Sequence, residues 1–139
     1  MQVVAKYISL KTKGNSQIID ITSSIQEKFE ETGLSDGIAT IFVQGSTGAV
    51  TTLEYEPGLI KDMNGLFERL APSGAGYAHD ATWGDANGHS HLRASTIGPC
   101  LIVPFVDGSL TLGTWQQVIF IEFDTRPRSR EILIQFMGK

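Results

Sequence analysis

The segment LIVPFVDGSLTL at residues 101–112 consists of two apolar runs, 101–106 and 109–112, separated by Asp107-Gly108. An Asp-Gly pair between such runs is the strongest short-range signal for a β-hairpin, because a type I′ turn needs positive φ at both central residues. This segment therefore predicts two antiparallel strands joined by a tight turn.

Other runs of β-branched and aromatic residues predict further strands. These runs cover residues 2–12, 17–21, 37–43, 49–54, 117–123 and 131–137. Turn residues at 13–16 are expected to join the first two runs as another hairpin. Because the strands follow one another in hairpins and do not alternate with helices, we predict an α+β fold. Its mainly antiparallel sheet would have about seven or eight strands, with helices packed on it.

Three helices are predicted, over residues 22–33, 57–71 and 89–97. Apolar residues recur at helical spacing in the first two, and Gly98 is expected to end the third. Thr22 or Ser23 is the expected N-cap of the first helix, with Gln26 completing a capping box after Ser23. Pro57 suits the first turn of the second helix, where its missing N–H is not needed.

Length and composition indicate one ordinary domain over residues 1–139, with 41% hydrophobic and 19% charged residues. A net charge of −4 argues against a nucleic-acid partner. No apolar run approaches the ~20 residues that cross a bilayer, and Lys6 and Ser9 interrupt any secretory signal. The single cysteine, Cys100, suits a reducing compartment, so we predict a cytoplasmic protein with no membrane partner.

All three histidines, His79, His89 and His91, lie in or just after a long segment without periodicity, residues 73–88. Such loops are usually functional in compact domains. Three nitrogen or oxygen ligands with an open fourth position are typical of catalytic zinc, so His79, next to Asp80, and the other two histidines are candidate ligands of a divalent metal. Joint binding requires His89 to precede the first helical turn, since residues two apart diverge on a helix. The alternative is a set of polar loop residues.

Two more polar segments are candidate phosphate-binding sites. Ser46 and Thr47 lie between glycines, whose backbone can approach an anion, although a tight turn between strands explains them equally. Arg126, Arg128 and Arg130 alternate along the chain and would project together from an extended segment. Guanidinium groups bind phosphate or carboxylate well, while a solvated turn or an intersubunit salt bridge is the alternative.

From about residue 38 to the end, the chain resembles the YjbQ family, small proteins often described as secondary thiamine-phosphate synthases. The resemblance is carried by these residues and motifs: Glu54, Asp62, FERLAP at 67–72, YAH at 77–79, NGHSHLRAS at 87–95, and the segment from Gly98-Pro99 to LGTWQ at 112–116. The resemblance implies an antiparallel α+β fold, a homotrimer, a weak thiamine-phosphate-forming activity and a polar pocket that includes histidines.

By the same resemblance, the candidate catalytic residues are Glu54, His79, Asn87, His91, Ser95, Thr114 and Gln116. This chain departs from the family pattern at residues 45–48, where Gly-Ser-Thr-Gly replaces a frequent His-Thr-Ser-Ala, so one pocket histidine is absent. His89 is not a constant feature of the pattern.

Three function hypotheses follow, each with a small and preferably phosphorylated molecule as the ligand. The first is a thiamine-phosphate synthase-like enzyme, in which a metal or arginines stabilise the departing pyrophosphate. The second is a metal-dependent hydrolase of a phosphate ester or amide, with Glu54 as the base. The third is a trimeric metabolite-binding protein without catalysis.

Overall fold

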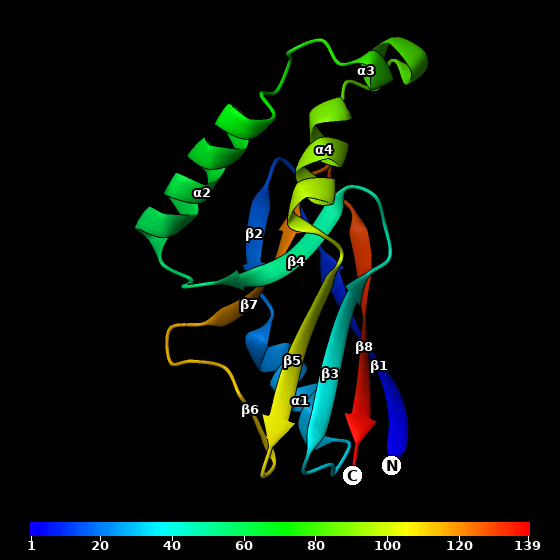
Figure 1. The fold of residues 1–139 in the computed structure, drawn as a ribbon. Helices are drawn as coiled ribbons and strands as arrows, with labels where there is room; N and C mark the ends of the chain where they lie inside the picture. Colours follow the sequence, from blue (N-terminus) through cyan, green and yellow to red (C-terminus); the bar gives the residue numbers. More distant parts are fainter.

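The computed structural model describes residues 1–139 and has eight strands and four helices, which confirms the predicted α+β class. The strands are β1 (Gln2–Lys11), β2 (Gln17–Asp20), β3 (Gly37–Val43), β4 (Gly48–Leu53), β5 (Cys100–Val106), β6 (Ser109–Leu110), β7 (Gln117–Glu122) and β8 (Ser129–Gly138). The helices are α1 (Thr22–Glu30), α2 (Pro57–Leu70), α3 (Ala78–Trp83) and α4 (Gly88–Ile97). Figure 1 shows α2, α3 and α4 at the end of the molecule away from the chain termini.

The strands form two antiparallel sheets, in the orders β1-β8-β3-β5-β6 and β2-β7-β4. The β5–β6 hairpin is present as predicted, and Asp107 and Gly108 both have positive φ, at 50° and 73°. The expected hairpin between residues 2–12 and 17–21 is wrong, because β1 pairs with β8 and β2 with β7. The turn before β2 bonds instead to a distant segment, since the Asn15 N–H donates to the Asp124 carbonyl.

Strand β7 is buried on both of its faces and separates two hydrophobic cores. Val118 and Phe120 face the larger core, between the five-stranded sheet and α1. Ile119 and Ile121 face the smaller core, where Phe67 of α2 and Ala94 of α4 pack on the three-stranded sheet. This packing fixes α2 and α4 on one face of the smaller sheet (Figure 1).

The helices differ from the sequence expectation in two respects, the N-terminus of α1 and the presence of α3. The predicted capping box of α1 does not form; the Asp20 carboxylate instead accepts hydrogen bonds from the Thr22 N–H and hydroxyl, at 2.9 and 2.6 Å. Helix α3 was not predicted, because six residues are too few to display a helical repeat. It ends at Gly84, whose φ of 70° allows the left-handed conformation typical of a C-terminal glycine.

Gly65 lies within α2 and offers a stability prediction. An added Cβ would have an Arg69 guanidinium nitrogen as its nearest neighbour, at 3.5 Å, an ordinary contact. We expect Gly65→Ala to raise the free energy of unfolding by about 0.5–1 kcal/mol, because alanine loses less backbone entropy in a helix. Urea unfolding checks this. Gly37→Ala is the control and should destabilise strongly, because its Cβ would overlap the Met137 carbonyl oxygen.

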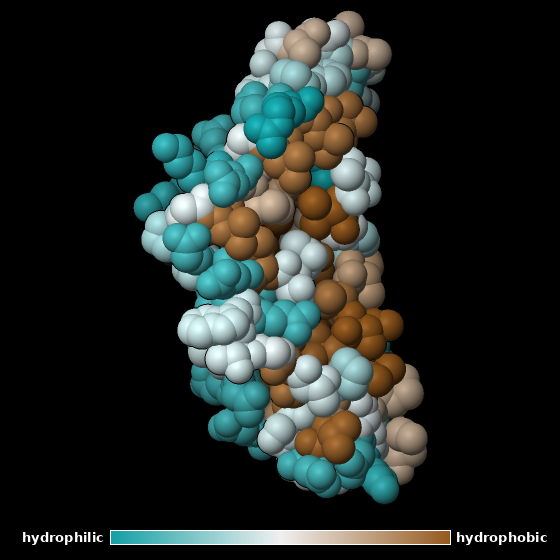
Figure 2. All heavy atoms as spheres, turned by 60° about the vertical axis from the view of Figure 1, so that its left-hand side comes forward, coloured by the Kyte–Doolittle hydropathy of each residue, from teal (hydrophilic) through white to brown (hydrophobic).

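No helix covers the outer face of the five-stranded sheet. Several apolar side chains are exposed there on neighbouring strands: Val3, Tyr7, Phe42, Ile102, Val106 and Met137. Apolar side chains also run along one side of the molecule in Figure 2. None of the helices combines the length and the apolar character that crossing a membrane requires.

Candidate functional site

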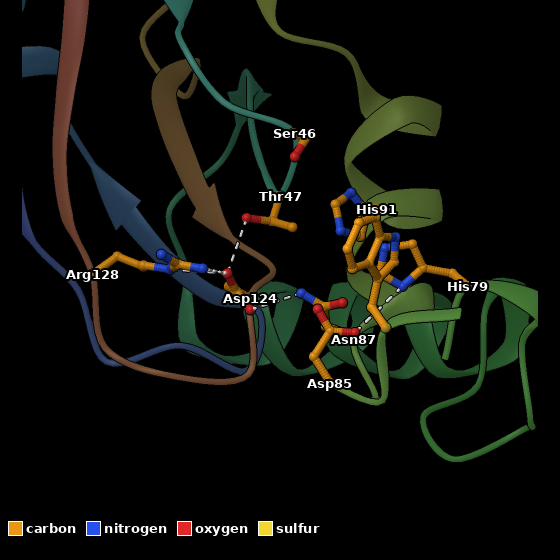
Figure 3. A pocket seen from close by; sticks show the side chains of 9 residues that line it. Ser46, Thr47, His79, Asp85, Asn87, His91, Asp124 and Arg128 are labelled. Carbon is orange, nitrogen blue, oxygen red and sulfur yellow. Dashed lines mark hydrogen bonds and ion pairs between the residues drawn. The ribbon is translucent and has the colours of Figure 1, made fainter. Parts of the chain in front are cut away.

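An open pocket of about 300 Å³ lies where α3 and α4 meet the β3–β4 loop and the segment after β7. It is lined by Ser46, Thr47, His79, Trp83, Asp85, Asn87, His91, Asp124 and Arg128. Residues 73–88 double back, so the rings of His79 and His91 lie 4.5 Å apart between centroids. Figure 3 shows the labelled side chains converging from these parts of the chain and from the connection between α3 and α4, which carries Asp85 and Asn87.

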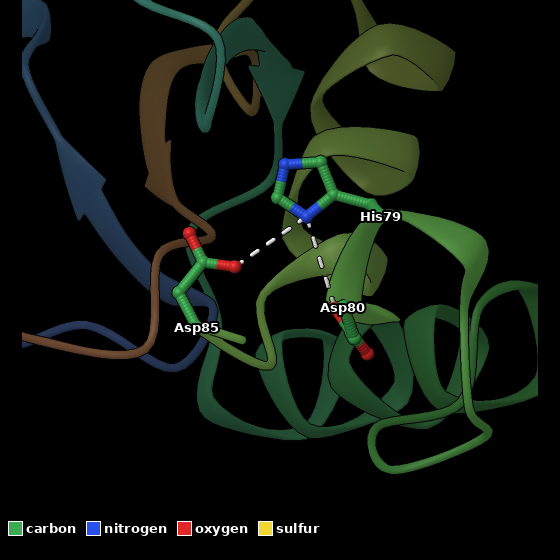
Figure 4. A group of neighbouring side chains, drawn as sticks. All are labelled: His79, Asp80 and Asp85. Carbon is green, nitrogen blue, oxygen red and sulfur yellow. Dashed lines mark ion pairs between the residues drawn. The ribbon is translucent and has the colours of Figure 1, made fainter. Parts of the chain in front are cut away.

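His79 lies against two carboxylates, one from α3 and one from the connection that follows it. Its Nδ1 is 3.5 Å from an Asp85 oxygen and 3.8 Å from an Asp80 oxygen (Figure 4). One ligand atom from each of the three residues lies within 4.8 Å of the others. Nδ1 is shielded from solvent and makes no hydrogen bond. These separations are long for a hydrogen bond. They are close to ~3.3 Å, the distance between two ligand atoms that each lie about 2.0–2.1 Å from a tetrahedral cation.

Local backbone contacts hold this segment in shape. The Asp80 carboxylate accepts a hydrogen bond from the Gly88 N–H at 2.8 Å, which joins α3 to the first turn of α4. Gly88 is required at this point, because a Cβ would lie 2.7 Å from the Cβ of Tyr77. Asp80 therefore ties the start of the helix that carries His91 to the helix that carries His79.

Asn87 is nine-tenths buried and lies between the loop carboxylate Asp85 and a second carboxylate, Asp124. In one amide orientation its Nδ2 donates to Asp124 at 3.4 Å. In the rotated orientation it donates to the two Asp85 oxygens at 3.1 and 3.2 Å. The amide therefore lies between the two carboxylates and donates to one or the other, depending on its orientation.

Asp124 is 1% exposed and ionised. Burial alone would raise the pKa of its carboxyl. Hydrogen bonds from the Arg128 guanidinium, the Thr125 N–H and Asn87 outweigh that effect and lower the pKa to about 2. The Arg128 Nε and a terminal nitrogen both donate to one Asp124 oxygen, at 2.9 and 2.5 Å. Arg128 thus faces the pocket with its charge already paired.

This ion pair gives a pH prediction. The folded pKa of Asp124 is about 2, below the ordinary 3.8, so its contribution to stability is complete above 3.8 and is lost as the pH falls toward 2. We expect Arg128→Ala to raise the folded pKa toward 3.8 and to move the midpoint of acid unfolding to higher pH. Circular dichroism against pH measures it, with Arg126→Ala as the control; equal midpoints for both variants would contradict the assignment.

Behind the pocket, Arg130 pairs with Glu122, which is fully buried on β7. Its Nε and a terminal nitrogen donate to the two Glu122 oxygens at 2.7 and 2.6 Å. Arg130 also donates to the Thr47 hydroxyl at 2.8 Å, and that hydroxyl donates to Asp124 at 3.3 Å. Arg126 alone of the three arginines makes no hydrogen bond or ion pair, and it lines an adjoining cavity of about 250 Å³.

His89 does not line the pocket. Helix α4 begins at Gly88, so His89 is already helical and diverges from His91, with its ring 6.4 Å from that of Tyr77. It is 7% exposed, and burial, followed by the charge of Arg93, lowers its pKa. Its Nδ1 has no partner. The condition for joint binding by His89 and His91, a His89 ahead of the helix, is therefore not met.

The remaining candidate residues lie in other places. Glu54 and Thr114 line a separate cavity of about 370 Å³ beside Trp115. The Gln116 amide donates to the Thr52 hydroxyl at 3.3 Å, away from the histidines. Ser95 lines a groove of about 150 Å³ that shares Ser46 and His91 with the main pocket. Within one chain, the pocket thus joins His79, Asn87, His91, Ser46, Thr47 and Arg128.

Asp85 and Asp124 are pocket residues that the sequence analysis missed. Asp85 carried a usable signal, since it lies in the same aperiodic segment as His79 and Asp80. Asp124 follows an apolar strand that also contains Glu122. Charges in such a run indicate buried ion pairs, because buried carboxylates are rarely left without a partner.

The fold and the pocket define an antiparallel α+β protein with a polar, histidine- and carboxylate-lined site at the end of its smaller sheet. The family model of UPF0047 YjbQ-like proteins matches residues 6–139, so the chain belongs to this family.

Relatives match over nearly their whole length. A UPF0047 protein of Methanothermobacter thermautotrophicus is 38% identical over 139 residues, covering 100% of this chain and 95% of the relative. YugU of Bacillus subtilis is 34% identical over 135 residues, or 96% and 98% of the two chains. A YbjQ-like protein of unknown function from Sulfolobus solfataricus has a TM-score of 0.89 at 27% identity, covering 99% of this chain and 100% of that chain.

Proposed function

We propose that this chain is a metal-dependent enzyme that acts on a small phosphorylated molecule at the pocket between α3 and α4. The observation that carries the proposal is the unpartnered, shielded Nδ1 of His79, which has carboxylate oxygens of Asp85 and Asp80 at 3.5 and 3.8 Å. A divalent cation, with zinc favoured by the histidine ligand, would fit among these three donors.

The bound cation would supply Lewis-acid chemistry and lower the pKa of a water ligand. His91 lies outside the three-donor cluster but its ring is 4.5 Å from that of His79, so it is placed to accept or give a proton. From the sequence, the role of base was assigned to Glu54, which lines a different cavity of the same chain. In this proposal His91 has that role. Ser46 and Asn87 line the same pocket and are placed to orient the substrate.

The guanidinium of Arg126 is available to bind a phosphate group of the substrate. Arg126 makes no ion pair, and its cavity shares Asp85, Asn87, Asp124 and Arg128 with the main pocket. The charges of Asp124 and Arg128 cancel each other locally. The combination of cation and Arg126 would balance the charge of a phosphoryl group.

Two reactions fit this arrangement. The first is hydrolysis of a small phosphate ester or amide. The second is thiamine-phosphate formation, in which the thiazole nitrogen attacks the pyrimidine methylene carbon and pyrophosphate leaves. The free Arg126 favours the second candidate, because a departing pyrophosphate needs a cationic partner besides the metal.

The first test is metal analysis of protein purified without an affinity tag and supplied with zinc, manganese or magnesium. We expect about one ion per chain. Both reactions are then assayed with and without chelator, using a panel of phosphate esters and amides and the two thiamine-phosphate precursors. Ligand binding without turnover would instead favour the metabolite-binding hypothesis, and protein that never binds metal would contradict the proposal.

We also propose that the chain forms a homotrimer through the outer face of its five-stranded sheet. That face exposes apolar side chains on β1, β3, β5 and β8. Stable interfaces bury about 800 Å² per partner, and small domains often complete their packing by symmetric assembly. Ile102, 56% exposed on β5, is the test position. We expect Ile102→Lys to convert a trimer into monomers by light scattering; a wild-type monomer would contradict the proposal.

A further inference from the structure

Trp83 is the feature of the pocket that metal chemistry does not explain. It is the one hydrophobic residue that lines the pocket, and 73% of its surface is exposed. It ends α3, four residues after His79, so both side chains lie on the same side of that helix. Exposing an indole to water is less favourable than burying it. An aromatic side chain that lines a polar pocket is typical of a ligand contact.

Two further cavities adjoin the pocket that Trp83 lines. The cavity of Arg126 shares Asn87 and Asp124 with it. The groove that Ser95 lines shares Ser46 and His91 with it. A ligand that binds Arg126 through an anionic group can therefore extend into the pocket that His79 and Trp83 line.

The polar groups around the indole restrict what can cover it. Ser46 and His91 offer hydrogen bonds along the same pocket, so a purely aliphatic ligand would leave them without partners. A planar heteroaromatic ring satisfies both demands, because its face stacks on the indole while its edge carries nitrogen and oxygen atoms.

We propose that Trp83 is a stacking platform that selects phosphorylated substrates bearing a planar heteroaromatic ring. The inference rests on the proposed function in one respect: it takes the ligand to be a small phosphorylated molecule bound in this pocket. It assigns the contact with the ring to Trp83 and makes Trp83 a residue that determines specificity.

The test compares phosphorylated probes with and without a ring. Uridine 5′-monophosphate and thiamine monophosphate carry a heteroaromatic ring, and ribose 5-phosphate does not. The protein is the metal-loaded Trp115→Phe variant, which removes the chain's other tryptophan, a residue of the separate cavity. Binding is measured by titration calorimetry, and quenching of the remaining indole fluorescence reports stacking directly.

We expect at least one ring-bearing probe to quench Trp83 and to bind about ten-fold more tightly than ribose 5-phosphate. Trp83→Ala should abolish that preference and leave the affinity for ribose 5-phosphate unchanged, while Trp83→Phe should retain part of it. Equal affinities for all three probes, failure of all three to bind, or a preference that survives Trp83→Ala would overturn the inference.

Chelator separates this inference from the metal proposal. If the protein never binds metal but still prefers ring-bearing probes, the metal site is wrong and the stacking role of Trp83 is supported. One bound ion together with no ring preference would do the reverse.

Discussion

Replacing His79 with alanine should remove the bound metal. The imidazole supplies the one nitrogen of the three-donor cluster, and the two carboxylates left behind would repel each other without it. Changes to residues that only orient metal ligands already cost about 10–100-fold in metal affinity, so loss of a ligand is expected to cost at least that much. Metal content after dialysis and the metal-dependent reaction rate should both fall to background.

A second variant separates metal binding from folding and from proton transfer. Asp85→Asn keeps the shape of its side chain and should also weaken metal binding, because the carboxylate charge is lost. His91→Ala is the matched control: its imidazole lies in the same pocket but outside the cluster, so it should retain the metal and lose turnover. If His79→Ala and wild type hold equal metal at equal melting temperature, the assigned ligands are wrong.

Arg130→Met should produce the largest loss of stability. It leaves the Glu122 carboxylate, which is fully buried, without its guanidinium partner. Breaking a buried pair in this way costs about 3–5 kcal/mol, because the remaining charge stays in a medium of low polarity. The urea midpoint measures the loss.

Arg126→Met is the matched control, since Arg126 is exposed and unpaired, and its effect should stay within about 0.5 kcal/mol. Adding Glu122→Gln to Arg130→Met should recover part of the loss, because a neutral amide costs less to bury than a carboxylate. Equal urea midpoints for Arg130→Met and Arg126→Met would show that the buried pair contributes nothing.

Structure that depends on neighbouring residues was predicted correctly, whereas the pairing of strands far apart in the sequence was not. Asp107-Gly108 predicted its hairpin because the residues of the turn themselves dictate the conformation. The turn at 13–16 was an equally clear local signal, but the hairpin predicted from it is wrong. A turn does not specify which strand the following residues pair with. Strand β2 joins β7 about a hundred residues later, through cores assembled from the whole chain.

The site shows the same limit. The clustering of histidines in an aperiodic segment indicated the right part of the chain, and His79 and His91 do meet. Their separation from His89 depends on where α4 begins, which the sequence predicted only to within a residue. Asp124 reaches the pocket from the end of β7, a contact that no local pattern encodes.

The pairing of the first strand with the last has a consequence for synthesis on the ribosome. Strand β8 lies inside the five-stranded sheet, between β1 and β3, yet it is the last to be made. Until residues 129–138 leave the exit tunnel, the edges of β1 and β3 that β8 joins have no native partner, and such edges invite aggregation. The larger sheet therefore cannot close before β8 has emerged, and a nascent chain stalled before β8 is expected to be a client of chaperones.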